Sequence, residues 1–297
     1  MCCSQTFTCG IRNRSYICCI RSQYCICCSH IRNCRSCSRS FLPRQRKQYA
    51  PLPGQPSLQR MTGCTGYWRR ILPYIPASIN CSYGSRSRRV YLYVHGKNGC
   101  KEEAERFAGT ACAAGWQVLA IDLPEHGARK NSPEQLLPWV AVPEIEAVYA
   151  RMKPVWAHIR LYGVSIGAWL AMQALQGDAP EQALLASPVV DMEALITNMM
   201  QYAHVTEEQL QRAGEIPTDL GETLSWPYLC WVREHPLHWH GRTQVLYGDR
   251  DALTSRTLIE RFRQESGAHL TIMEGGEHWF HTPVQMAAVQ MWEEANL

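Results

Sequence analysis

Short apolar runs recur along the chain from about residue 89 onward, separated by longer segments of mixed polarity. They lie at 89–94, 116–122, 158–162, 183–187, 245–248 and 270–273. These runs are mostly apolar and rich in branched and aromatic residues, which is typical of strands buried on both faces. Such strands, alternating with helices, form a parallel sheet that helices cover on both faces. The sequence therefore predicts an α/β fold with a mostly parallel sheet.

Helical patterns occupy most of the intervals between these runs, at 102–114, 166–176, 255–264 and 283–296. In one further interval, Ser132 as a cap and Pro133 in the first turn predict a helix start. Pro143 is expected to divide that helical region in two. Residues 67–89 mix aromatic, proline and basic residues and predict at most one or two short leading strands.

Residues 188–240 interrupt the alternation of strands and helices. They contain large apolar side chains at helical spacing and lie between two predicted core strands. We expect these residues to form a small helical cap over the carboxyl ends of the strands, where ligands bind in open α/β sheets. A satellite core without a functional role is the alternative. The large apolar residues are Met192, Leu195, Met199, Met200, Tyr202, Trp226, Tyr228, Leu229 and Trp231.

The first 60 residues differ in composition from the rest. They hold 10 Lys and Arg and no acid, whereas the remainder holds 20 Lys and Arg against all 26 acids. Ten of the 15 cysteines also lie in the first 40 residues, at spacings that suit neither a zinc site nor a disulfide knot. We predict that residues 1–60 are a disordered, low-complexity leader or an over-extended reading frame with Met61 as the working start. The folded α/β domain is then expected at 61–297.

The sequence contains no apolar run of secretory-signal type and none that approaches the roughly 18 apolar residues of a membrane span. The cysteines beyond the leader are odd in number and scattered, which suits reduced thiols in a cytoplasm. We expect a cytoplasmic protein with no nucleic-acid or membrane partner, and the oligomeric state stays open. The five cysteines are Cys64, Cys81, Cys100, Cys112 and Cys230.

The segment 161–170 joins an apolar strand end directly to a helix through the pattern Gly-x-Ser-x-Gly. A serine on such a sharp turn needs neighbours without side chains, and Gly163 and Gly167 meet that need. The helix start would also supply backbone N–H groups where negative charge develops. Ser165 is therefore the candidate nucleophile.

A serine nucleophile needs a base, and the base needs an orienting carboxylate. Asp251 follows the run at 245–248, and His278 follows the run at 270–273. The chain order Ser165, Asp251, His278 is the order found in hydrolases with the Gly-x-Ser-x-Gly turn. Asp249 is a competing acid, and His281 is a rival base.

With these residues, the chain resembles the α/β-hydrolase superfamily over about residues 87–296. It looks most like small bacterial serine esterases of the cytoplasm, with similarity to the prolyl-oligopeptidase-like and dienelactone-hydrolase-like branches. The resemblance implies that Ser165 is the nucleophile, His278 the general base and Asp251 the acid of a Gly-x-x-Asp turn. It also implies an oxyanion hole made by the backbone N–H groups of Lys97 and Ile166, with no metal or organic cofactor.

Four further residues are predicted to bind substrate or to shape its site. His95 precedes the oxyanion loop and is expected to orient it, while His126 lies in a loop common in the family and is expected in the pocket wall. Trp226 in the cap and Trp279 beside His278 complete the set. Three more histidines at the end of the cap are interpreted as surface or hinge residues and not as metal ligands. They are His235, His238 and His240.

The function that these expectations favour is hydrolysis of small esters by two-step acyl transfer through Ser165. A peptidase or a thioesterase could use the same three residues. A non-catalytic binding module of the same fold is the alternative from another functional class. Hydrolases of halides or epoxides are disfavoured, because those relatives need a carboxylate at the position of Ser165.

Overall fold

The computed structural model describes residues 80–219 and 221–297, and every element named below lies within them. The predictions of a leader at residues 1–60 and of a working start at Met61 fall outside the described residues.

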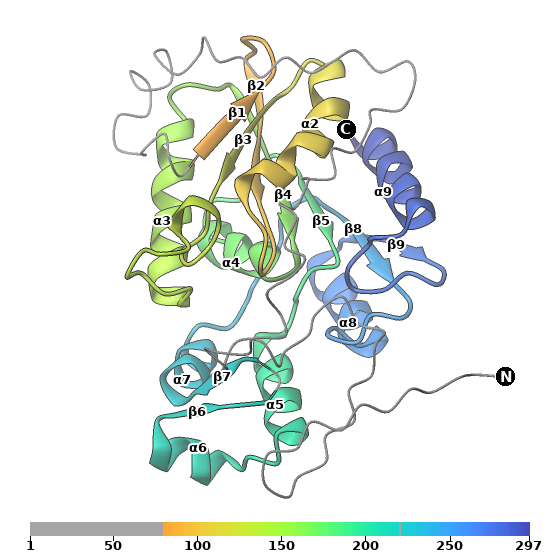
Figure 1. The fold of residues 1–297 in the computed structure, drawn as a ribbon. Helices are drawn as coiled ribbons and strands as arrows, with labels where there is room; N and C mark the ends of the chain where they lie inside the picture. The colour runs from red at the N-terminus through yellow and green to blue at the C-terminus, as the bar shows by residue number, and fades with distance from the viewer. Residues whose placement is uncertain (1–79, 220) are drawn as a thin grey trace, which may run out of the picture. The chain divides into compact units, whose positions relative to one another are not determined.

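A seven-stranded sheet forms the centre of the described chain, in the order β1-β3-β2-β4-β5-β8-β9 (Figure 1). Only the edge strand β1 is antiparallel to its neighbour, and the other neighbouring pairs are parallel. The predicted mostly parallel sheet is therefore confirmed. The strands are β1 (Asn80–Tyr83), β2 (Arg89–Val94), β3 (Gln117–Ile121), β4 (His158–Val164), β5 (Ala183–Ala186), β8 (Thr243–Gly248) and β9 (His269–Met273).

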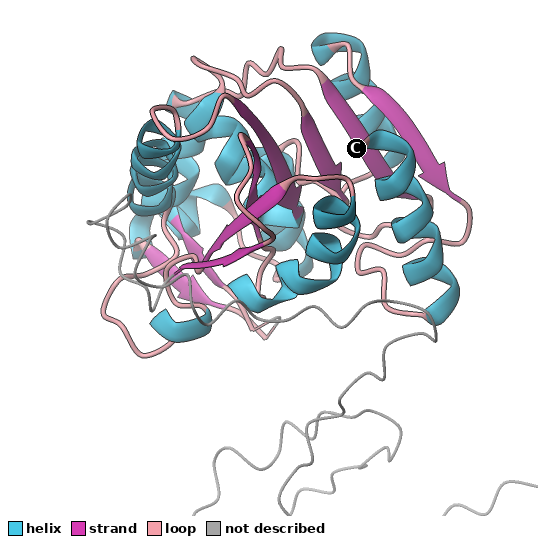
Figure 2. Cartoon of the chain, turned by 90° about the horizontal axis from the view of Figure 1, so that it is seen from above, coloured by secondary structure: helices cyan, strands magenta, loops and turns pink. Residues whose placement is uncertain are grey.

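Helices cover both faces of this sheet (Figure 2). The helices around the sheet are α2 (Ala104–Ala113), α3 (Pro138–Met152), α4 (Ser165–Leu175), α8 (Arg256–Ser266) and α9 (Pro283–Asn296), with 3-10 turns η2 (Lys101–Glu103) and η3 (Gly127–Arg129).

Strand β2 shows how the sequence divides the core between the two faces. Its side chains alternate, as the twofold repeat of a strand requires. Val90, Leu92 and Val94 join a cluster with apolar residues of α3, α4 and α8. Tyr91 and Tyr93 join a second cluster with residues of α2 and α9. Both faces of β2 are buried, so its run is apolar throughout rather than alternating with polar residues.

Helix α3 differs from the sequence prediction at both proline positions. It begins at Pro138 rather than near Pro133, since Pro138 takes the first helical position, where its fixed φ is favourable. It then continues through Pro143 to Met152 without a break. Pro143 is exposed, so the carbonyl that loses its helical partner can face water. The predicted division of this region at Pro143 is wrong.

Between β5 and β8 the chain leaves the sheet and forms a separate group of elements, which we call the insertion (residues 188–240). Its helices pack onto the same core cluster as α3, α4 and α8. The insertion also contains a short antiparallel hairpin, which the purely helical prediction missed. Its elements are α5 (Met192–Tyr202), α6 (Glu207–Ala213), β6 (Glu215–Pro217), β7 (Thr223–Ser225) and α7 (Trp226–Glu234).

Two chemical features of the described residues bear on the sequence predictions. No helix among them is both long and apolar enough to cross a membrane. Their four cysteines are free thiols, namely Cys81, Cys100, Cys112 and Cys230.

Candidate active site

Ser165 lies at the junction of β4 and α4 in a backbone conformation that non-glycine residues rarely adopt, with φ at 51°. Tight packing around the turn explains the two flanking glycines. A Cβ added to Gly163 would lie 2.7 Å from the Cα of Ala168, and one added to Gly167 would lie 2.1 Å from the carbonyl oxygen of His95. Both distances are far shorter than carbon atoms tolerate, so no larger residue fits this turn without moving the backbone.

The structure brings Ser165, His278 and Asp251 into one chain of hydrogen bonds. The Oγ of Ser165 lies 2.8 Å from Nε2 of His278, and Nδ1 of His278 lies 2.7 Å from Oδ2 of Asp251. Because a carboxylate only accepts, Nδ1 carries the proton and Nε2 can accept one from the hydroxyl. The side chain of Asp251 has no exposed surface, and its Oδ1 accepts the N–H groups of Leu253 and Thr254.

The sheet explains why these distant residues meet. The strands β4, β8 and β9 are parallel members of one sheet, so the loops that follow them leave from the same edge. The loops after β8 and β9 also touch, since a Cβ on Gly248 would lie 2.4 Å from the carbonyl oxygen of Gly276. The N–H of Val189, which follows β5, donates to the carbonyl oxygen of Ser165.

The competing acid and base have other contacts. The carboxylate of Asp249 accepts the N–H of Gly275 at 2.7 Å, on the exposed side of the loop. The Nδ1 of His281 lies 2.8 Å from the carbonyl oxygen of Trp279, and its ring stacks on the Trp279 ring. The hydrogen bonds to Ser165 and to the imidazole thus come from His278 and Asp251 rather than from these rivals.

The loop after β2 lies directly against Ser165. In the sheet register Val94 is opposite Gly163, and a Cβ on Gly96 would lie 3.2 Å from the Cβ of Ser165. Lys97 is the next residue in this loop. Helix α4 has no side-chain cap. Its first N–H groups, including that of Ile166, therefore have no hydrogen-bond partner within the helix. This arrangement can present two backbone donors beside the hydroxyl, and their roles in an oxyanion hole stay predictions.

His95 and His126 hold the loops that flank this site. Both are buried. In each ring Nε2 accepts a backbone N–H, from Leu123 for His95 and from Asn98 for His126. Each Nδ1 faces a carbonyl oxygen, that of Gly96 at 2.7 Å and that of Pro124 at 2.6 Å. Both nitrogens of each ring are thus engaged by backbone groups, and the roles of His95 in orienting the loop and of His126 in the pocket wall stay predictions.

The pKa of His95 leads to a prediction on stability. Burial lowers this pKa from its usual value near 6.5 to about 4. Between these values the unfolded chain binds the proton and the folded chain does not, so stability falls as the pH falls from 6.5 to 4. We expect His95→Gln to make this fall less steep, by up to about 1.4 kcal/mol per pH unit. Urea unfolding across this range measures the slope, and an equal slope in both proteins would contradict the prediction.

The two predicted tryptophans lie in different surroundings. Trp226 begins α7 and is half-buried against the main core cluster. Trp279 follows His278 directly, and 73% of it is exposed. Their part in substrate binding stays a prediction.

Two features of this edge carried no clear signal in the sequence. Ser187, directly after β5, also has a positive φ, at 43°, and its buried hydroxyl has no hydrogen-bond partner among the described residues. The ammonium of Lys97 forms an ion pair with Glu222 of the insertion, at 2.7 Å. The pair spans 125 residues of sequence, and no spacing rule links such positions.

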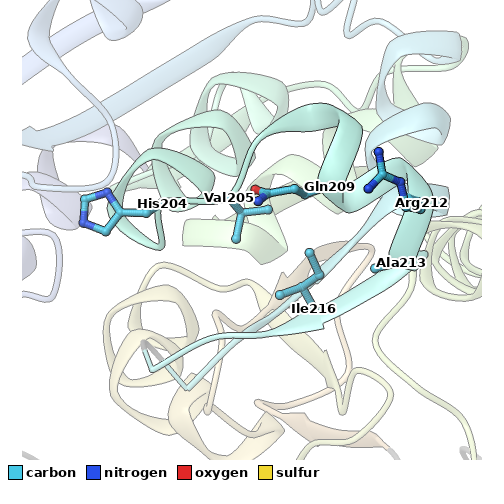
Figure 3. Close-up of a pocket in the computed structure, with 6 residues that line it drawn as sticks. All are labelled: His204, Val205, Gln209, Arg212, Ala213 and Ile216. Atoms are coloured by element: carbon cyan, nitrogen blue, oxygen red, sulfur yellow. The ribbon is translucent and has the colours of Figure 1, made fainter.

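A hollow of about 460 Å³ lies in the insertion itself, between α6 and β6. None of the candidate site residues lines it. Figure 3 shows Val205, Gln209 and Ile216 near its middle, with His204 and Arg212 at opposite ends.

No group of three or more His, Cys, Asp or Glu side chains in residues 80–219 and 221–297 is placed to hold a metal ion. The three histidines at the end of the insertion are all exposed, namely His235, His238 and His240.

Comparison with known proteins gives matches in structure. No protein-family model matches the chain, and no curated protein does. Among solved structures, Est1E from Butyrivibrio proteoclasticus with bound ferulic acid matches with a TM-score of 0.58 and 16% identity, over 73% of this chain and 93% of that one. The α/β hydrolase domain-containing protein 10 from mouse matches with a TM-score of 0.55 and 14% identity, over 71% and 90%.

A monoacylglycerol lipase from Paleococcus ferrophilus also matches, with a TM-score of 0.51 and 16% identity, over 73% of this chain and 98% of that one. At such identities a structural likeness establishes the fold and leaves the reaction open. The strand order, the turn at Ser165 and these likenesses agree: the chain has the α/β-hydrolase fold.

Proposed function

We propose that the chain is a serine hydrolase that cleaves ester bonds of small acyl substrates through an acyl-enzyme intermediate on Ser165. The hydrogen-bonded series from Ser165 through His278 to Asp251 carries this proposal, with contacts of 2.8 and 2.7 Å. The neighbours in structure support the same class, since they include an esterase from Pyrococcus furiosus and a monoacylglycerol lipase.

In the first step, Oγ of Ser165 attacks the ester carbonyl carbon while Nε2 of His278 takes the hydroxyl proton. The buried carboxylate of Asp251 stabilises the imidazolium that forms. The carbonyl oxygen becomes an oxyanion that accepts from the N–H groups of Lys97 and Ile166, each donor being worth about 3 kcal/mol of the barrier. The imidazolium then gives its proton to the leaving alcohol, and an acyl ester remains on Ser165.

In the second step, a water molecule replaces the alcohol. His278 takes a proton from the water, the resulting hydroxide attacks the acyl carbon, and the acid leaves as Oγ regains its proton. These steps use only the three side chains and two backbone amides.

The insertion is proposed to act as a cap over this edge of the sheet. Its contact with the oxyanion loop through Lys97 and Glu222 supports that role. Free thiols at the four described cysteines accord with a reducing compartment, and we propose the cytoplasm.

Labelling with a fluorophosphonate probe tests the proposed nucleophile and its partners together. The full chain should react, and peptide mapping should find the adduct on Ser165. Matched pairs of variants separate the partners from their rivals. We expect His278→Gln and Asp251→Asn to lose labelling by on the order of 10³-fold or more, because the base is removed or held in the wrong tautomer. His281→Gln and Asp249→Asn should label like the unchanged protein. An adduct on another residue, or equal labelling within each pair, would refute the assignment.

A further inference from the structure

The backbone around Lys97 is held at a fixed place beside Ser165. On one side, the carbonyl oxygen of Gly96 accepts from the N–H of Gly99 and lies 2.7 Å from the His95 ring. On the other side, Asn98 has a φ of 62° and donates its N–H to His126 at 2.9 Å. These contacts on both sides fix the backbone position from which the Lys97 side chain extends.

Glu222, the partner of Lys97, is also held by its backbone. It immediately precedes β7, and its carbonyl oxygen accepts from both the N–H and the Oγ1 of Thr218, at 2.9 and 2.7 Å. These two hydrogen bonds tie Glu222 to Thr218, directly after β6, and so hold the backbone from which the carboxylate of Glu222 projects. The ion pair joins two anchored backbones, one in the core and one in the insertion.

The ion pair between Lys97 and Glu222 is exposed to solvent, so another carboxylate can replace that of Glu222. The side chains of Lys97 and Glu222 are 42% and 39% exposed, and exposed ion pairs contribute little to stability. The neighbouring Lys101 is different, because its ammonium is buried against the carboxylate of Asp122. Lys97 thus carries, one residue beyond the glycine that packs on Ser165, an exposed ammonium group that another carboxylate could reach.

Glu222 has a second neighbour in the insertion, the hydroxyl of Tyr228. Burial is the main cause that raises the pKa of this hydroxyl, and the charge of Glu222 adds to it. Tyr228 therefore stays neutral at ordinary pH and does not compensate the charge of Glu222. The carboxylate of Glu222 is balanced by Lys97.

We propose that the ammonium of Lys97 recognises a carboxylate carried by the substrate, and that Glu222 occupies this position in the free protein. This inference rests on the proposed function. The substrates it selects are esters with a carboxylate a few bonds from the scissile carbonyl, on the acyl or the alcohol side. The flexible four-carbon stem of a lysine can follow either arrangement. Charge-assisted hydrogen bonds to carboxylates are stronger than neutral ones, which gives the preference its physical basis.

The internal carboxylate of Glu222 must be displaced before such a substrate binds. Removing its charge should therefore favour anionic esters and leave neutral esters little affected. Removing the charge of Lys97 should act in the opposite direction. These opposite signs distinguish substrate recognition from a merely structural ion pair, since loss of a structural contact would affect both kinds of ester alike.

The test compares kcat/KM for ester pairs that differ in charge. Monomethyl glutarate and methyl valerate vary the acyl side, and 3-acetoxypropanoate and propyl acetate vary the alcohol side. We expect Glu222→Gln to raise the anionic-to-neutral ratio about tenfold on one of these sides, and Lys97→Met to lower it by a similar factor. The shift should shrink in 0.5 M salt, which screens exposed charges. Glu207→Gln, which breaks the exposed pair with Arg233 in the same insertion, should leave the ratio unchanged.

An unchanged ratio in both variants, on both sides, overturns the inference. The same holds if Glu207→Gln shifts the ratio as much as Glu222→Gln does. Failure of the proposed function would give a different experimental result. In that case the unaltered protein hydrolyses neither neutral ester and does not react with the fluorophosphonate at Ser165.

Discussion

Ser165→Ala is expected to abolish ester hydrolysis, with kcat reduced by on the order of 10⁴-fold or more. The substitution removes the atom that would form the acyl ester, and no other hydroxyl in the described residues is hydrogen-bonded to His278. Hydrolysis of p-nitrophenyl acetate measures the loss.

Ser187→Ala is the matched control for this substitution. Ser187 lies at the same edge of the sheet, but its hydroxyl has no hydrogen-bond partner among the described residues. It should retain activity, and the far-ultraviolet circular dichroism spectra of both variants should match that of the unaltered protein. Substantial turnover by a folded Ser165→Ala protein would contradict the proposed mechanism.

Glu293→Ala is expected to produce the largest loss of stability. Glu293 in α9 is fully buried, and its carboxylate accepts two hydrogen bonds from Arg106 of α2 and one from the Tyr162 hydroxyl of β4. Removing the Glu293 carboxylate leaves the donors of Arg106 and Tyr162 without their acceptor in the interior between α2, α9 and the sheet. We expect a loss of about 3 kcal/mol, the lower end for a broken buried ion pair, because Arg106 is partly exposed and can turn toward water.

Urea unfolding followed by tryptophan fluorescence measures this loss. Glu294→Ala is the control, since the next residue of α9 is exposed and, among the described residues, bonds to Gln290 of the same helix. Its effect should stay within about 0.5 kcal/mol, as is usual at exposed positions. Equal destabilisation by the two substitutions would show that the buried ion pair is not the cause.

Much of the core could be predicted from the sequence, because strands buried on both faces leave a strong local signal. The apolar run at 89–94 became β2, and that at 158–162 became part of β4. The turn at Ser165 was predictable for a steric reason, since its two glycines are required by close packing. The hydrogen bonds among Ser165, His278 and Asp251 follow from parallel strands that end at one edge.

The insertion was less predictable. Its hairpin has two strands of three residues each, and such short strands form through tertiary contacts rather than by a pattern of their own. Pro143 misled the prediction in a similar way, because packing of the buried face of α3 outweighs one lost hydrogen bond on the exposed face. The pairing of Lys97 with Glu222 depends on how the insertion lies against the core, which local sequence does not encode.

The order in which these residues occur has a consequence for synthesis. Ser165 precedes His278 by 113 positions, and Asp251 lies between them. A nascent chain on the ribosome therefore contains the proposed nucleophile long before it contains the imidazole proposed to activate it. Under the proposed mechanism, ester hydrolysis therefore requires that translation has passed β9, the last strand of the sheet, and reached His278.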